Sequence, residues 1–208
     1  MTLPELSFHY SWVPANPKSD KTLLLHHGTG GNENDLLDLG KLVAPNFNLL
    51  SVRGKVSEDG LNRFFKRKSI GVFDVEDLKF RSIELGQFIR NAKKKLEIEE
   101  DQIVALGYSN GANIATGVVF HDPKLLSGAV LSRPMVPYQP EKIDLQKIKI
   151  LLISGIMDTT MSPEEPERLE RIYRENNGIV TAHALSMSHG LSTEDIRIVQ
   201  EWVMNNFD

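Results

Sequence analysis

Short apolar segments of strand length recur along the chain, separated by longer amphipathic segments. The first, residues 5–13, alternates apolar with polar positions, which predicts a half-exposed edge strand. The later segments are continuously apolar, a pattern typical of strands that are covered on both faces. These predicted strands are residues 22–26, 48–52, 103–106, 128–131 and 148–153, with 179–185 as a last strand.

Between the predicted strands, apolar residues repeat with the 3.6-residue period of helices. Such patterns cover residues 34–44, 76–96, 110–121, 163–176 and 193–206, and Ser192 is the predicted N-cap of the last helix. Alternating strands and helices predict an α/β fold. We expect one domain, residues 1–208, with a mostly parallel sheet of about seven strands and helices on both faces. Ligands of such sheets bind at the carboxyl ends of the strands, so functional residues are expected there.

The composition narrows the classes of function. Of the 208 residues, 40% are hydrophobic and 25% are charged, and the formal net charge is −4. This balance argues against nucleic-acid binding, which favours a strongly basic surface. The chain has no cysteine, which excludes disulfides, thiolate metal ligands and a cysteine nucleophile. The first residues lack the features of a signal peptide, and no apolar run is long enough to span a membrane, so we expect a cytoplasmic protein.

The run Gly107-Tyr108-Ser109-Asn110-Gly111 is a G-x-S-x-G motif, placed between a predicted strand and a predicted helix. A sharp strand-to-helix turn holds a serine in a strained conformation, and the residues two positions away must be small to avoid collision. The serine also lies at the start of a helix, where the dipole favours negative charge. Ser109 is therefore the predicted nucleophile. The alternative is a glycine-rich turn with an incidental serine.

The glycine-rich loop that follows residues 22–26 is a candidate oxyanion hole. Acyl transfer needs two backbone N–H donors aimed at the developing negative charge. In sheets with such a serine turn, one donor belongs to the residue after the nucleophile and one to a loop after an early strand, which predicts Asn110 and Thr29. His26 and His27 could suggest a metal site, but adjacent strand residues point to opposite faces, so no metal is expected. We interpret His27 as bracing the loop.

The acid and base follow from chain order, which in this arrangement runs serine, acid, histidine. His189 lies between the last predicted strand and the last predicted helix, at the same edge as Ser109. Asp158 comes a few residues after the predicted strand 148–153. The other candidates fall before strands, within elements or at the wrong edge: His121, His183, Asp122, Asp144 and Asp195. The predicted triad is Ser109, Asp158 and His189; for Asp158 alone, a turn-forming aspartate is the alternative.

These motifs together resemble the phospholipase/carboxylesterase family of small α/β-hydrolases, in particular its bacterial carboxylesterase-like branch. The matching segments are HGTGGNE at 27–33, GYSNGA at 107–112, GIMD at 155–158 and SHG at 188–190. The resemblance implies the α/β-hydrolase fold and an acyl-enzyme mechanism without a cofactor. The segment NRFF at 62–65 resembles the family stretch whose aromatic pair lines the acyl pocket, which implies substrate binding by Phe64 and Phe65. Lys66 follows where eukaryotic acyl-protein thioesterases usually have an aspartate.

About fifteen residues, Arg133 to Lys147, separate two predicted strands where many relatives of this fold insert a lid. We therefore expect no large lid and an open site. The predicted function is a carboxylesterase acting on a small-molecule ester, with a lysophospholipase or an acyl thioesterase as alternatives. A catalytically silent ligand-binding protein of the same fold is a third alternative, although such a protein usually lacks part of the triad. The sequence is compatible with a homodimer.

The long connection of residues 54–75 contains three phenylalanines and several cations: Phe64, Phe65, Phe73, Arg63, Lys66, Arg67 and Lys68. One interpretation is a solvated basic loop that aromatic side chains fix to the core. The other is that Phe64 or Phe65 forms the acyl-pocket wall, while the cations favour substrates with a negative group through their field.

Overall fold

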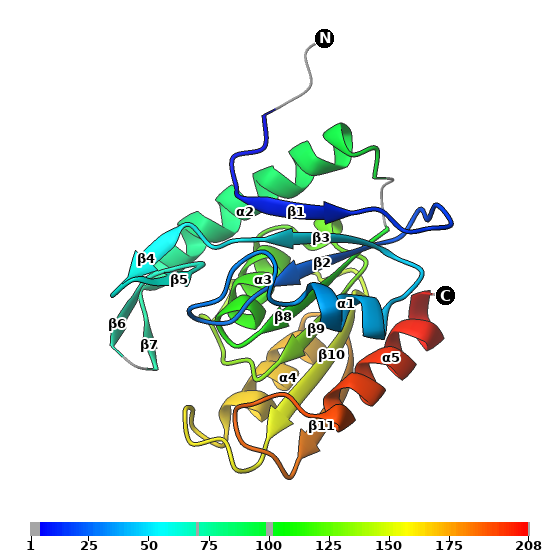
Figure 1. Cartoon of the computed structure of the whole chain (residues 1–208). Helices are drawn as coiled ribbons and strands as arrows, with labels where there is room; N and C mark the ends of the chain where they lie inside the picture. Colours follow the sequence, from blue (N-terminus) through cyan, green and yellow to red (C-terminus); the bar gives the residue numbers. More distant parts are fainter. Residues whose placement is uncertain (1–4, 70, 99–101, 208) are drawn as a thin grey trace.

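A seven-stranded sheet forms the centre of the computed structural model, which describes residues 5–69, 71–98 and 102–207 (Figure 1). Its strand order is β1-β3-β2-β8-β9-β10-β11. β1 pairs antiparallel with β3, and the other neighbours pair in parallel. The strands are β1 (Tyr10–Val13), β2 (Thr22–His26), β3 (Asn48–Val52), β8 (Ile103–Tyr108), β9 (Gly128–Ser132), β10 (Lys149–Gly155) and β11 (Ile179–Leu185).

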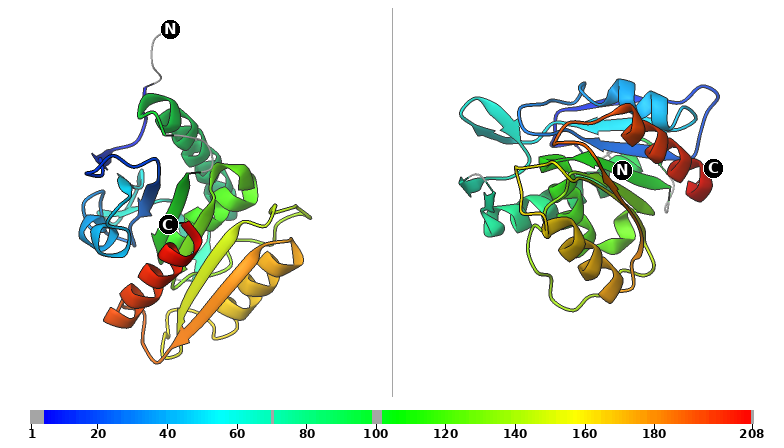
Figure 2. Two further views of the ribbon diagram at one scale, coloured as in Figure 1. Left: turned by 90° about the vertical axis from the view of Figure 1, so that its right-hand side faces the viewer. Right: turned by 90° about the horizontal axis from the view of Figure 1, so that it is seen from below.

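Helices cover both faces of the sheet, as predicted (Figure 2). They are α1 (Leu37–Val43), α2 (Val75–Lys95), α3 (Asn110–His121), α4 (Glu165–Glu175) and α5 (Thr193–Phe207), with a short 3-10 helix, η1 (Pro123–Leu125). α1 and α5 pack on one face, and α2, α3 and α4 on the other. No helix among the described residues is long and apolar enough to cross a membrane.

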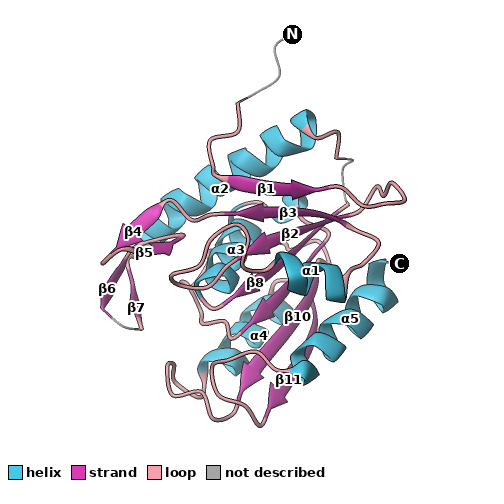
Figure 3. Cartoon of the chain, viewed as in Figure 1, coloured by secondary structure: helices cyan, strands magenta, loops and turns pink. Residues whose placement is uncertain are grey.

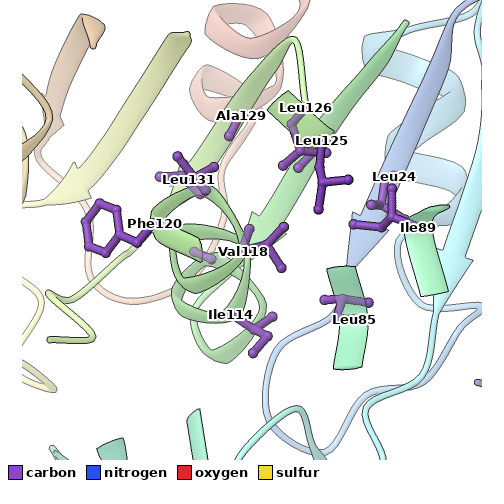
Figure 4. Close-up of a cluster of buried hydrophobic side chains, with 14 of the residues drawn as sticks. Leu24, Leu85, Ile89, Ile114, Val118, Phe120, Leu125, Leu126, Ala129 and Leu131 are labelled. Atoms are coloured by element: carbon purple, nitrogen blue, oxygen red, sulfur yellow. The ribbon is translucent and has the colours of Figure 1, made fainter. Parts of the chain in front are cut away.

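The apolar core consists of two layers, because alternate residues of a strand point to opposite faces of the sheet. In β2, Leu24 faces the layer under α2 and α3, while Leu23 and Leu25 face the layer under α1 and α5. Figure 4 shows part of the first layer, where Ile114 and Val118 of α3 lie among side chains of the sheet and of α2. Every residue of β2 is buried, which explains its continuous apolar pattern.

Two predicted elements are shorter than expected. The edge strand β1 begins at Tyr10 rather than residue 5, because Tyr10 pairs with Val52 and β3 ends there. α1 begins at Leu37 rather than residue 34. Ahead of it the amide of Asn34 bonds to the side-chain oxygen of Asn32, and such local side-chain bonds compete with helix formation. The other strands and helices agree with prediction to within a few residues.

Two small hairpins occupy the connection from β3 to α2, where no strands were predicted (Figure 3). They pair β4 (Val56–Glu58) with β5 (Leu61–Arg63), and β6 (Arg67–Ser69) with β7 (Val72–Phe73). Strands of two or three residues are too short for a periodic pattern. The turn of the first hairpin did have a signal: Asp59 and Gly60 both have positive φ, and Asp-Gly favours such two-residue turns.

Candidate active site

The turn from β8 into α3 holds Ser109 in a strained conformation, with φ of 54° and ψ of −114°. Positive φ is uncommon for residues other than glycine. The turn lies so close to the end of β2 that a Cβ atom on Gly111 would collide with the carbonyl oxygen of His26. A Cβ on Gly107 would collide with the backbone of Gly111. The turn itself therefore requires Gly107, and its close approach to the end of β2 requires Gly111.

The three residues of the predicted triad form a chain in which His189 lies within hydrogen-bonding distance of both Ser109 and Asp158. Ser109 follows β8, Asp158 follows β10, and His189 follows β11, so all three lie at the carboxyl edge of the sheet. Nε2 of His189 is 2.9 Å from Oγ of Ser109, and Nδ1 is 2.7 Å from Oδ2 of Asp158. If Nδ1 of His189 carries the proton and donates to the carboxylate, Nε2 is free to accept from the serine hydroxyl.

Thr160 is a fourth member of this cluster, and it was not predicted from the sequence. Its amide and its hydroxyl both donate to Oδ1 of Asp158, at 2.9 and 2.6 Å. Burial alone would raise the pKa of Asp158, but hydrogen bonds from Thr160 and His189 outweigh it and hold the pKa below its usual value. The carboxylate is thus ionised at neutral pH and fixed in direction. The only sequence signal was the D-x-T spacing, which is common in turns.

The two predicted oxyanion donors lie beside Ser109 on separate elements. Asn110 is the first residue of α3, where the amides of the first turn have no partner inside the helix. Its side-chain oxygen accepts a 2.7 Å bond from the amide of Phe64. Thr29 belongs to the loop after β2, and its hydroxyl accepts a 2.6 Å bond from Nη1 of Arg63. The last residue of the first hairpin and the residue after it therefore hold both candidate donors in place.

The adjacent histidines at the end of β2 have different surroundings, and both ring nitrogens of His27 are engaged in hydrogen bonds. Nε2 of His27 accepts a 3.0 Å bond from the amide of Gly54, so Nδ1 carries the proton and donates to the carbonyl of Gly28 at 2.6 Å. This geometry supports the interpretation that His27 braces the loop. His26 is fully buried, and burial lowers its pKa to about 3, so its ring is neutral.

A cleft beside the triad, hereafter the serine cleft, has a volume of about 220 Å³. It is lined by Thr29, Arg63, Arg67, Gly71, Phe73, Ser109, Asn110, Asn113, Arg133, Met135, Thr160, Met161 and His189. A larger open groove of about 1040 Å³ lies at the opposite, amino edge of the strands and contains none of these residues. The serine cleft is therefore the place where a substrate can reach Ser109.

The aromatic wall of this cleft differs from the prediction. Phe64 and Phe65 are 2% and 0% exposed and do not line the cleft. Phe64 packs against the rings of His26 and His27, and Phe65 packs edge-on against Phe73. Phe73 lines the cleft in their place. Phe64 or Phe65 was expected at this wall, whereas the structure places Phe73 there, because the local pattern does not reveal which aromatic side chain the core buries.

The cations of the same segment do not all line the cleft, although they were predicted to act as one group. Lys66 is exposed and does not line the cleft; its amide bonds to the side chain of Asp77. Arg63 and Arg67 do line it. These two arginines, rather than Lys66, are therefore the cations of the segment that a substrate would meet.

Arg133 holds the loop that carries His189. Its guanidinium is fully buried, with Nε donating to the carbonyl of Ser188 at 3.0 Å and Nη2 to that of Gly190 at 2.8 Å. It also forms a bidentate pair with Asp195 at 2.8 and 3.1 Å. We call Arg133 and Asp195 the His189 clamp, since they fix the backbone on both sides of that histidine. Burial would raise the pKa of Asp195, but bonds from Arg133 and Ser192 hold it below its usual value.

Replacing Arg133 with methionine is expected to lower the free energy of unfolding by about 3–5 kcal/mol, because Asp195 would remain a buried charge without its partner. Urea denaturation at pH 7 measures this. The loss should shrink as the pH falls toward the ordinary carboxyl pKa of about 3.9, since an unpaired buried carboxyl takes up its proton above that value. Arg197→Met is the matched control: Arg197 pairs with Glu194 and Glu201 at the surface, so little change is expected. Equal losses in both variants would contradict a clamp.

The parallel sheet, the strained serine turn and the polar cluster at the carboxyl edge are those of an α/β-hydrolase. Residues 10–206 match the family model described as Phospholipase/Carboxylesterase, and the chain belongs to that family. It is 42% identical over 185 residues to the putative hydrolase MhqD of Bacillus subtilis strain 168, covering 88% of this chain and 92% of that protein. These findings confirm the resemblance found in the sequence.

Solved structures agree with this assignment. A carboxylesterase of Bacillus cereus is similar with a TM-score of 0.93 and 40% identity, covering 97% of this chain and 95% of that one. A carboxylesterase of Mesorhizobium loti has a TM-score of 0.88 and 29% identity, covering 97% of each chain. The protein is thus a hydrolase of the carboxylesterase family.

Proposed function

We propose that this protein is a serine carboxylesterase that hydrolyses small carboxylic esters through an acyl-enzyme on Ser109. The observation that carries the proposal is the hydrogen-bonded chain from Ser109 through His189 to Asp158, with distances of 2.9 and 2.7 Å. A catalytically silent protein of this fold has no need to keep all three side chains in register, so the complete chain favours an enzyme.

In the proposed mechanism, His189 takes the proton of Ser109 as its oxygen attacks the ester carbonyl. Asp158 holds the histidine in the correct tautomer and stabilises the imidazolium that forms. The amides of Asn110 and Thr29 donate to the oxyanion, and His189 then protonates the leaving alcohol. A water molecule, activated by the same histidine, attacks the acyl-enzyme and releases the acid.

The size of the serine cleft supports a small acyl group. Its volume of about 220 Å³ is below the roughly 300–1,000 Å³ of cavities that enclose drug-sized ligands. The segment from residue 133 to 148 contains no helix or strand, so the described residues there provide no lid. These features favour a short-chain carboxylesterase over a lysophospholipase. An acyl thioesterase remains an alternative, because it uses the same chemistry and differs only in releasing a thiol instead of an alcohol.

A series of 4-nitrophenyl esters tests this proposal. We expect the highest kcat/KM for acetate to butyrate, with a fall of about tenfold or more by octanoate, because each further methylene must extend beyond a small cleft. A fluorophosphonate should add to Ser109, as peptide mass spectrometry would show, and butyryl esters and thioesters should be compared in parallel. A preference for palmitoyl or lysophospholipid substrates would favour the lysophospholipase. Absence of hydrolysis and of labelling would refute an esterase.

A further inference from the structure

The charged side chains that line the serine cleft are of one sign. Among the described residues that line it, Arg63, Arg67 and Arg133 are cationic and no aspartate or glutamate takes part. Arg133 is neutralised by Asp195 and fully buried. The carboxylate of Asp158 is close by, but its side chain is 1% exposed and lies behind His189. The charge that a substrate meets is therefore decided by Arg63 and Arg67.

These two arginines share a single carboxylate. Nε of Arg67 is 2.5 Å from Oε1 of Glu58, and Nε of Arg63 is 3.5 Å from Oε2 of the same residue. Burial lowers the pKa of Arg63, and the charge of Arg67 lowers it further, but an arginine remains charged at neutral pH. Two cations beside one anion leave an excess of one positive charge at this wall.

The donors of the two side chains are not equally available. Arg63 is 4% exposed and donates to the hydroxyl of Thr29 and to the carbonyl of Phe65. Its role is to hold the candidate oxyanion loop. Arg67 is 27% exposed, and only its Nε has a side-chain partner within the described residues. Its two Nη groups can therefore meet a ligand, in the fork geometry that suits a carboxylate.

We propose that Arg67, supported by the charge of Arg63, forms a subsite for a carboxylate of the substrate, so that the preferred substrates are esters that also carry a free carboxylate. One excess positive charge matches one monoanionic group. The neighbouring Phe73, Met135 and Met161 supply apolar surface for the carbon chain between the ester and the carboxylate. This inference rests on the proposed esterase function and names its substrate class.

Two pairs of substrates with equal size but different charge test the subsite. The 4-nitrophenyl half-ester of adipic acid is compared with its terminal amide, which places the charge on the acyl side. 4-Acetoxybenzoate is compared with 4-acetoxybenzamide, which places it on the alcohol side. The measured quantity is kcat/KM for the carboxylate divided by kcat/KM for the amide. In the parent we expect this ratio to reach about tenfold in at least one pair, as charged hydrogen bonds allow.

Three variants separate contact from long-range attraction. Arg67→Gln should reduce the ratio about tenfold, and Arg67→Lys should restore part of it, because a cation is retained without the fork. Lys66→Gln removes the same charge from the adjacent, exposed residue and should leave the ratio unchanged. The preference should persist at about 1 M salt, where the field of distant charges is screened.

A ratio near one in both pairs would overturn the proposal, as would equal reductions by Arg67→Gln and Lys66→Gln. The neutral amides distinguish these outcomes from failure of the esterase itself. If the parent hydrolyses the amide-bearing esters without preferring the carboxylates, only the subsite is refuted. If it hydrolyses none of the four compounds, both the function and the subsite are refuted.

Discussion

Replacing Ser109 with alanine is expected to lower kcat/KM for short esters by a factor of about a thousand or more while leaving the fold intact. The change removes the oxygen that forms the acyl-enzyme, but the two candidate oxyanion amides and the serine cleft remain. Alanine and serine have similar backbone preferences, so the strained turn at φ of 54° should persist. Initial rates, fluorophosphonate labelling and the circular dichroism spectrum measure the three parts of this expectation.

Ser186→Ala provides the matched control, because Ser186 is exposed in the same loop as His189 and contributes no side chain to the cleft. That variant should keep parent activity and labelling. Full labelling of the Ser109→Ala protein, with activity retained, would show that another residue is the nucleophile.

The second large effect is expected for Asp158→Asn, which should lower kcat by about three to four orders of magnitude. An amide at this position can present its NH₂ group to the histidine. It would then favour the tautomer in which Nε2 carries the proton and cannot accept that of Ser109. The bonds from Thr160 can still form to the amide oxygen, so stability should change little. The measurement is kcat from pH 6 to 9, together with a thermal unfolding curve.

Asp144→Asn is the control for the choice of carboxylate. Asp144 is exposed and accepts bonds from the amide of Gln146 and the side chain of Asn177, away from the serine cleft. Its replacement should leave kcat unchanged. If instead Asp144→Asn were inactive and Asp158→Asn near parent, the acid would be the carboxylate before β10 rather than the one after it.

The buried strands and the serine turn could be predicted because each depends on the pattern of residues that are close together in the sequence. A strand that has helices packed on both faces of its sheet needs apolar side chains pointing to both faces, as in β2. The G-x-S-x-G motif marks a tight strand-to-helix turn within five adjacent residues, although Gly111 is required by the neighbouring strand β2. Positions after strand ends then suggested Asp158 and His189, since parallel strands bring their carboxyl ends to one edge.

Other features depend on partners far along the chain and could not be predicted. Arg133 and Asp195 are 62 residues apart, and nothing near either residue indicates the other. Whether Phe65 or Phe73 faces the cleft is decided by how the second hairpin packs on the core, and that hairpin is too short for a pattern. The first hairpin, in contrast, could have been predicted from the sequence, because Asp59-Gly60 is a recognised turn signal.

The His189 clamp ties the C-terminal helix to the chemistry. Asp195 lies in the first turn of α5, and its carboxylate also accepts bonds from the amide and hydroxyl of Ser192. The loop around His189 and the start of α5 are therefore held together by the same set of bonds. A change that loosens the docking of α5 on the sheet, however distant from Ser109, acts on the histidine as directly as a change in the loop itself. The bonds that anchor the C-terminal helix are thus the same bonds that position the proposed catalytic histidine.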